Sequence, residues 1–197
     1  MHQPDAVGRA LGERGLDHAH LRRVAIGSWS GGYGAVSKIL DHDTGTESLD
    51  AVLVLDGIHC GFLDEGHAVL NALIISPFLR AAKRAAEGRL LFSITHSEID
   101  PIAYAGTYVT AGYLLDAVHG QRGEPLAAPE HVQLRAAEGA VAKRLEKRME
   151  PVYESTVGSF HVRGYRGNTA EHHMAHLLQM GATAMPELVR RWSSTAR

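Results

Sequence analysis

Short apolar runs alternate along the chain with longer segments of helical length and spacing. The runs are "RVAIGS" (23–28), "AVLVLD" (51–56), "LLFSIT" (90–95) and "SFHVRGY" (159–165), and the first three are almost continuously apolar. Such continuous runs are typical of parallel strands covered on both faces. Strands that alternate with helices indicate βαβ units. We therefore expect an α/β fold in which helices flank a mainly parallel sheet.

The helical segments lie before, between and after these runs. We expect helices at 6–15, 32–42, 66–88, 102–120, 132–150 and 169–192. The last segment should break at Gly181 or Pro186, because neither residue favours a helix interior. The stretch 119–131 has the composition of a linker, but we expect one domain over residues 1–197.

Composition excludes several classes of protein. The chain has 197 residues, of which 45% are hydrophobic and 21% charged, as in a soluble globular domain. Its net charge of −2 argues against a nucleic-acid partner, and no apolar run has the length of a membrane span. The single cysteine, Cys60, rules out an internal disulfide and suits a reducing compartment. We expect a cytoplasmic protein.

A candidate nucleophile lies between the first apolar run and the helical segment after it. Residues 27–31 read Gly-Ser-Trp-Ser-Gly and match the pattern G-x-S-x-G around Ser30. A serine on a tight strand-to-helix turn has a crowded backbone, which flanking glycines relieve. The helix N-terminus favours negative charge, so the Gly31 amide is placed to bind an oxyanion. The alternative is an ordinary glycine-rich bend.

The stretch "RRVAIGSWSGGYGAVSKIL" resembles the nucleophile elbow of the α/β-hydrolase family, with Ser30 as its serine. The resemblance continues through the following strands and covers most of the chain from about residue 20 onward. It implies a catalytic serine, then an acid, then a histidine, each on a loop that follows a strand. The histidine would come just after the last strand.

Three histidines follow the last expected strand. They are His172, His173 and His176 in "GYRGNTAEHHMAHLLQMG". We favour His173 as the base, because it lies at the expected junction of loop and helix, and place His176 second. His172 and His176 are four residues apart, a spacing that suits zinc. However, no glutamate lies between them as in H-E-x-x-H and no third ligand is evident, so we expect no metal and no cofactor.

Three carboxylates compete for the role of the acid. In the family the acid most often follows the strand that corresponds to 90–95, which favours Asp100 or Glu98. Some lipase-like members place it after the preceding strand, where Asp56 lies. An aspartate that directly follows buried apolar residues is costly to bury without a partner, so we favour Asp56, then Asp100. Asp56 in an Asp-Gly turn and Asp100 as a helix cap are the alternatives.

These residues together predict a serine hydrolase that cleaves ester or amide bonds of a small molecule. Ser30 would form an acyl-enzyme, His173 would transfer the proton and Gly31 would help to bind the oxyanion. An acyltransferase on the same fold is one alternative. A non-catalytic interaction scaffold is another, because a fold does not determine a function.

The chain departs from the family pattern before the first strand. Only about 22 residues precede that strand, whereas the family has several more strands before its elbow. The family's first oxyanion donor comes from a loop among those strands, and no HGGG-type loop occurs here. The first strand would then be an edge strand open to association. We expect a homo-oligomer, or the C-terminal part of a longer protein that supplies the missing segment.

Overall fold

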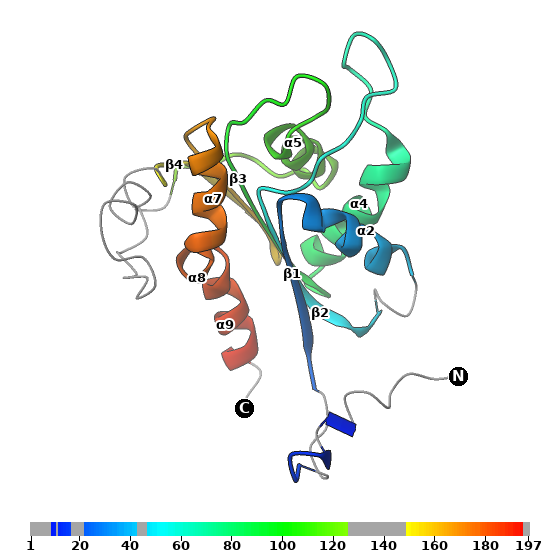
Figure 1. Ribbon diagram of the computed structural model, residues 1–197, viewed down its shortest axis with the longest axis vertical. Helices are drawn as coiled ribbons and strands as arrows, with labels where there is room; N and C mark the ends of the chain where they lie inside the picture. The colour runs from blue at the N-terminus through cyan, green and yellow to red at the C-terminus, as the bar shows by residue number, and fades with distance from the viewer. Residues whose placement is uncertain (1–8, 11, 17–21, 43–46, 126–148, 195–197) are drawn as a thin grey trace.

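A five-stranded sheet organises the residues that the structure describes (Figure 1). This computed structural model describes residues 9–10, 12–16, 22–42, 47–125 and 149–194. The strands, in the order β1-β2-β3-β5-β4, are β1 (Val24–Trp29), β2 (Leu49–Leu55), β3 (Leu91–His96), β5 (Phe160–Tyr165) and β4 (Pro151–Val157). β1, β2, β3 and β5 run parallel, and β4 pairs antiparallel with β5. The expected α/β fold with a mainly parallel sheet is therefore confirmed.

Helices cover both faces of this sheet (Figure 1). One face carries α2 (Tyr33–Asp41), α4 (Ala72–Ala86) and α5 (Thr107–Ala117). The other carries α7 (Ala170–Leu178), α8 (Met180–Thr183) and α9 (Met185–Ser194). This arrangement leaves the carboxyl ends of the parallel strands, and the loops that follow them, at one end of the molecule.

The two layers explain why the strand runs are apolar throughout. In β2, Val52 and Val54 belong to the larger core beneath α2, α4 and α5. Ala51 and Leu53 point the other way and pack with Leu188 of α9. Since successive side chains of a strand face opposite sides, both sides must be apolar when both are covered. The expected strands accordingly lie within two residues of those observed.

Strand β4 is absent from the expected elements. Its buried residues, Tyr153 and Ser155, alternate with more exposed ones, and one of the two is polar. It lies at the sheet edge and is joined to β5 through a turn at Gly158, which has a φ of +60°. A half-exposed edge strand therefore carries no continuous apolar run that would predict it.

Several helix boundaries also differ from those expected. α4 begins at Ala72 rather than at 66, because the Asn71 side chain caps it by accepting a hydrogen bond from the Leu73 amide (3.1 Å). α5 begins at Thr107 rather than at 102. The breaks expected at Gly181 or Pro186 occur instead at Gln179 and Ala184.

Pro186 lies in the first turn of α9, where a missing amide hydrogen costs little. Gly181 lies inside the short α8. The expected helix at 132–150 falls almost entirely outside the described residues, and Met149 and Glu150 are not helical. The expected helix at 6–15 and the stretch 119–131 are described only in part. Among the described helices, none has the length and apolar character needed to cross a membrane.

Candidate functional site

Ser30 lies on a sharp turn at the carboxyl end of β1. Its φ is +55°, in the left-handed region that side chains other than glycine rarely adopt. The chain passes from β1 into a 3-10 turn, η1 (Ser30–Gly32), before α2 begins at Tyr33. A 3-10 turn, rather than the expected α-helix, therefore follows the serine directly. Gly31 lies within this turn and is exposed. The half-buried Ser30 is thus held in a strained conformation at the carboxyl end of strand β1.

Gly57 brings the end of β2 against this turn. A Cβ atom at Gly57 would lie 2.5 Å from the Ser30 carbonyl oxygen and 2.8 Å from its amide nitrogen. Only glycine allows so close an approach. The pair Asp56-Gly57 therefore places a carboxylate next to the serine turn, which is more than an ordinary Asp-Gly bend would do.

Asp56 is buried, with 3% of its surface exposed, and also has a positive φ, +44°. Its Oδ2 lies 2.8 Å from His173 Nδ1. Ser97, directly after β3, donates two further hydrogen bonds, from its amide to Oδ1 (3.0 Å) and from its hydroxyl to Oδ2 (2.7 Å). The carboxylate is therefore fully engaged despite its burial.

These contacts keep the carboxyl group ionised. Burial raises the pKa of Asp56, but the hydrogen bond with His173, the nearby His176 and the hydrogen bonds from Ser97 outweigh that effect and lower the pKa to about 2. An ionised carboxylate can only accept, so His173 carries its proton on Nδ1. The other ring nitrogen, Nε2, is then a free base.

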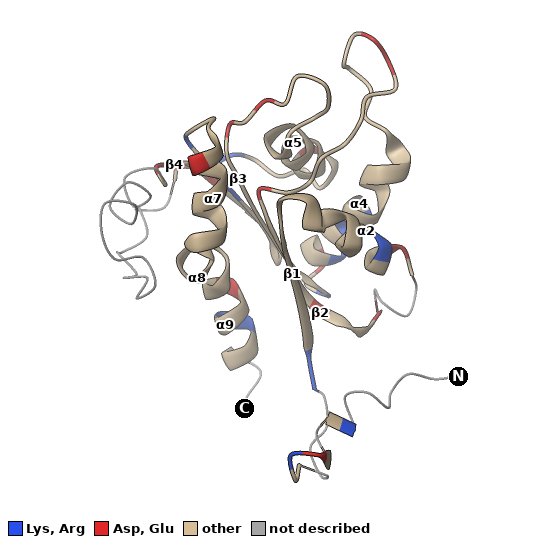
Figure 2. Ribbon diagram, in the orientation of Figure 1, with Lys and Arg blue, Asp and Glu red and all other residues tan. Residues whose placement is uncertain are grey.

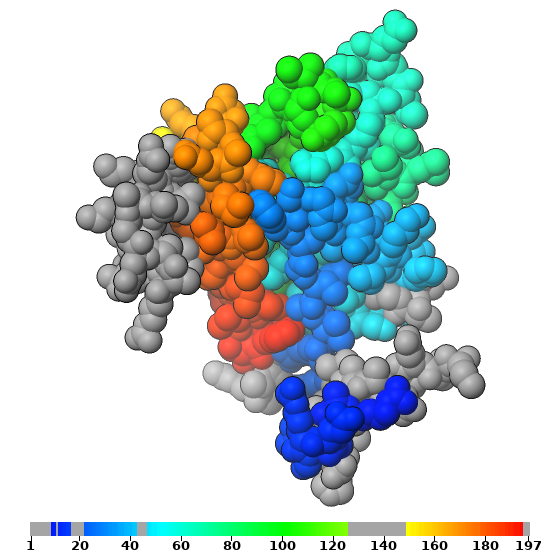
Figure 3. Space-filling view, viewed as in Figure 1, coloured from blue at the N-terminus to red at the C-terminus, as the bar shows by residue number. Residues whose placement is uncertain are grey.

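The residue before the serine fixes the other side of His173. The indole nitrogen of Trp29 donates to the His173 carbonyl oxygen (2.9 Å), and the two rings lie 4.7 Å apart. In the space-filling view α7 lies directly against the η1–α2 segment (Figure 3). Trp29 occupies the variable position of the G-x-S-x-G pattern, so the pattern itself does not predict this contact.

The structure pairs His173 with Asp56. α7 begins at Ala170, so His173 lies within the first turn of the helix, close to the junction of loop and helix where it was expected. His172 caps the helix, with Nδ1 2.8 Å from the Thr169 hydroxyl. His173, the fourth residue of the helix, is the histidine that contacts the Asp56 carboxylate.

His176 lies deeper in the same helix and does not pair with a carboxylate. It is fully buried, and its Nδ1 lies 2.8 Å from the Thr95 hydroxyl. Burial lowers the pKa of His176 to about 4. The Nδ1 atoms of His172 and His176 therefore each lie against a different hydroxyl group, that of Thr169 and that of Thr95.

The alternative acids lie on the loop after β3 and are exposed. Asp100 Oδ1 accepts a hydrogen bond from the Ile102 amide (3.0 Å), as a turn-capping residue does. Glu98 Oε2 accepts from the Gly167 amide (3.0 Å). No hydrogen bond joins either carboxylate to a described histidine. Of the three candidates, the structure brings only Asp56 to His173.

Two loops beside this site carry negative charge (Figure 2). Segments 57–71 and 97–106 contain Asp64, Glu65, Glu98 and Asp100 and no lysine or arginine. Negative charge on these two loops disfavours anionic ligands beside them, and Arg166 on the loop after β5 opposes this effect.

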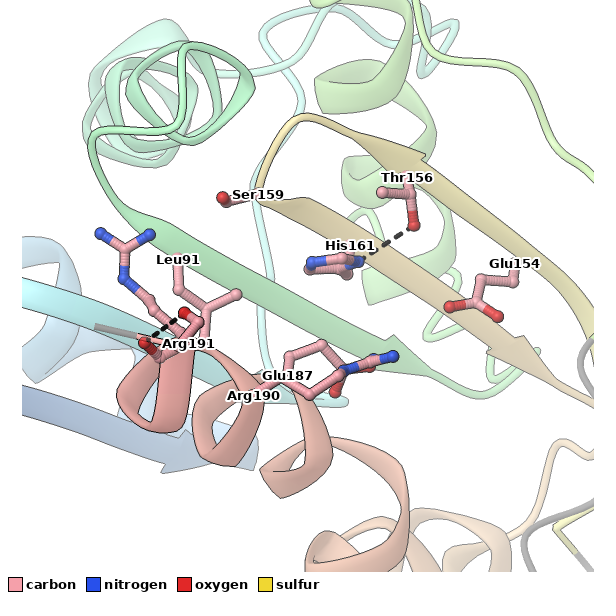
Figure 4. A pocket seen from close by; sticks show the side chains of 9 residues that line it. Leu91, Glu154, Thr156, Ser159, His161, Glu187, Arg190 and Arg191 are labelled. Carbon is pink, nitrogen blue, oxygen red and sulfur yellow. Dashed lines mark hydrogen bonds and ion pairs between the residues drawn. The ribbon is translucent and has the colours of Figure 1, made fainter. Parts of the chain in front are cut away.

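A second cluster of polar groups lies on the α9 face of the sheet (Figure 4). Glu154, His161 and Glu187 each offer a metal-ligand atom, and these atoms lie within 4.8 Å of one another. However, the Arg163 guanidinium already donates to both carboxylates, and Arg190 donates to Glu187 as well. A metal ion would face two guanidinium groups, so we assign this cluster to the attachment of α9.

No family model, curated protein or solved structure matches the chain significantly. The fold class therefore rests on the sheet and its helices, and the function must be argued from the site itself.

Proposed function

We propose that the chain is a serine hydrolase that cleaves ester or amide bonds of small molecules through an acyl-enzyme. The observation that carries the proposal is the 2.8 Å contact between Asp56 Oδ2 and His173 Nδ1, made beside the strained turn of Ser30. An ionised carboxylate fixes the tautomer of the imidazole, and the free Nε2 is the atom that would take a serine proton.

The chemical steps follow from these roles. Ser30 Oγ attacks the carbonyl carbon while His173 Nε2 removes the hydroxyl proton, and the carbonyl electron pair moves onto the oxygen. Asp56 stabilises the imidazolium that forms. The imidazolium then protonates the leaving group, and the acyl-enzyme remains on Ser30. Water repeats the sequence and releases the acid, whereas an alcohol or amine in its place would make the chain an acyltransferase.

The negative charge on the loops after β2 and β3 disfavours an anionic substrate beside those loops. Exposed apolar side chains on the same loops include Leu63, Val69, Ile102 and Tyr104. They offer apolar surface on the loops that follow β2 and β3.

A serine-directed fluorophosphonate probe and a small activated ester test the proposal. The probe should label Ser30, and Ser30→Ala should abolish both labelling and ester hydrolysis. Ser37→Ala, in the adjacent helix α2, is the matched control and should retain both. A folded parent that neither labels nor hydrolyses the ester would instead favour an interaction scaffold.

The histidine and the acid have neighbours that serve as matched controls. His173→Ala should cost about as much turnover as Ser30→Ala, because members of a triad act as a unit. His172→Ala should leave turnover near the parental rate. Equal losses in the two variants would contradict the assignment of the base.

Asp56→Asn should lower turnover by roughly 10⁴-fold with the fold retained, because the amide favours the wrong tautomer of His173. Asp100→Asn should have little effect, since its side chain caps a turn. Steady-state rates with circular dichroism as a folding check distinguish the two. The reverse pattern would move the acid to the loop after β3.

A further inference from the structure

Another histidine, His59, lies close to the proposed site and has no role in the steps above. It follows Asp56-Gly57 on a segment that is fixed at several points. The Ile58 carbonyl accepts a hydrogen bond from the Thr110 hydroxyl (2.9 Å). Cys60 exchanges backbone hydrogen bonds with Ala105 on the neighbouring loop (3.3 and 2.8 Å). The backbone of His59 is therefore held firmly beside the Ser30 turn.

Two aromatic rings hold the imidazole of His59 between them. The Tyr33 ring lies 5.4 Å away, edge to face, and the Tyr104 ring 5.3 Å away. Tyr33 is the first residue of α2, three positions after Ser30. Tyr104 is on the loop before α5 and is 41% exposed. The row Tyr33–His59–Tyr104 thus extends from the serine turn to the open end of the molecule.

The two nitrogens of this ring differ in their surroundings. Among the described residues, Nδ1 is buried and has no hydrogen-bond partner. A neutral imidazole has one N–H and one bare nitrogen, and a buried N–H without an acceptor is the rarer and more costly case. We therefore assign the proton to Nε2, which gives the half-buried ring an N–H donor on its other edge.

The ring is neutral at neutral pH. Burial lowers the pKa of His59, the Asp56 carboxylate opposes this shift, and His173 adds to it. The Asp56 carboxylate and the His173 ring thus both influence the charge state of His59. A neutral imidazole with its proton on Nε2 can donate a hydrogen bond without competing with His173 as a base.

We propose that His59 contacts the substrate and that its Nε2–H donates a hydrogen bond to the carbonyl oxygen that becomes negative when Ser30 attacks. This inference rests on the proposed function. His59 keeps its proton throughout, while the proton of Ser30 goes to His173 and then to the leaving group. It would act with the Gly31 amide as a second donor to the same oxygen.

The test compares two substitutions of similar size. His59→Leu removes the donor, and His59→Gln retains a side-chain N–H. With an activated ester, His59→Leu should lower kcat by about 10²- to 10³-fold with KM little changed, as loss of one oxyanion donor does. His59→Gln should recover a large part of that loss. His67→Leu, on the adjacent exposed loop, is the control and should leave kcat unchanged.

The outcomes separate this inference from the proposed function. Fluorophosphonate labelling and thermal denaturation of every variant show whether Ser30 is reactive and the fold intact. An active, labelled parent with a fully active His59→Leu variant would overturn the inference alone. Equal losses in the Leu and Gln variants, or a change in KM without a change in kcat, would also overturn it. A folded parent that is unlabelled and inactive would overturn both.

Discussion

Two side chains of the candidate site share a backbone conformation that costs free energy. Ser30 and Asp56 have φ values of +55° and +44°. A residue other than glycine in this region is strained by roughly 1–3 kcal/mol. Both residues lie directly after strands and contact each other's segment through Gly57, so the surrounding packing imposes the strain. Backbone strain of this kind concentrates where a protein positions reactive groups.

We predict that Ser30→Gly raises the free energy of unfolding by about 1 kcal/mol, because glycine adopts a positive φ without strain. Ester hydrolysis should be lost in the same variant. Ser37→Gly, inside α2, should instead lower stability by about 1 kcal/mol. Urea denaturation of the three proteins measures both effects. If Ser30→Gly is no more stable than the parent, the turn is not strained.

A buried histidine should make stability depend on pH. Burial lowers the pKa of His176 to about 4. An unfolded imidazole binds a proton below about 6.5, so between these values the unfolded chain binds more protons than the folded one. The free energy of unfolding should therefore fall as pH drops from about 6.5 to about 4, by roughly 3 kcal/mol in all.

Urea denaturation at pH 7 and pH 5 measures this dependence. His176→Gln should flatten it, whereas His67→Gln, at an exposed position, should not. Burial also lowers the pKa of His96, which contributes with the same sign. Asp56, whose pKa is about 2, acts only in more acidic solution. A stability that is constant from pH 7 to pH 5 would contradict the prediction.

The residues of the candidate site differ in how far the sequence predicts them. Asp56 could be predicted, because a carboxylate directly after a buried run must find a partner. Ser30 could be predicted from its glycines. Trp29 and Ser97 could not, since each contacts a residue far away in the chain through one specific side-chain orientation. Such partners depend on the final packing of the layers and not on local pattern.

At the scale of elements, one arginine joins helix α9 to strands β4 and β5. Arg163 donates to Glu187 on α9, to the Thr183 carbonyl and to Glu154 on β4 (3.0 Å). The Glu187 side chain is 1% exposed and that of Arg163 is 9% exposed. Breaking a buried pair by removing one partner leaves an uncompensated charge.

We predict that Arg163→Met lowers the free energy of unfolding by about 3–5 kcal/mol, because the buried Glu187 loses its buried counter-charge and keeps only the exposed Arg190. Arg80→Met is the control. Its pair with Asp41 is more than half exposed on both sides and should be worth at most about 1 kcal/mol. Thermal denaturation of both variants distinguishes them. Similar losses in the two would show that the Arg163 cluster is not a structural anchor.

The same scale shows why some elements could be predicted and others not. β1, β2 and β3 are covered on both faces, so their sequences are continuously apolar. β4 lies at the edge and mixes polar with apolar residues. The starts of α4 and α5 depend on Asn71 and Gly106, whose capping role is decided by the loops before them. Pattern therefore predicts buried elements better than their ends.

At the scale of the whole molecule, β1 is the exposed margin of the sheet. Among the described strands it pairs with β2 alone, and its second row of backbone donors and acceptors faces away from the sheet. An apolar edge of this kind invites pairing with another strand. β1 also ends at Ser30, so an added strand would lie beside the proposed site.

We predict that the purified chain associates at micromolar concentration and that activity follows the associated form. A stable interface would bury on the order of 1,000 Å². Light scattering combined with an ester assay over a dilution series checks this. A fully active species of 21.3 kDa at all concentrations would contradict the prediction.

The contact between Asp56 and His173 joins positions 117 residues apart, and Trp29 reaches His173 across 144 residues. Contacts of such sequence separation form late, because a long loop must close before they contribute. During synthesis, β1 and β2 leave the ribosome before α7 does. Until α7 has emerged, the chain would lack His173, the proposed base. In a translation reaction, esterase activity should therefore first appear when the fold is complete, and the nascent chain should be inactive before that point.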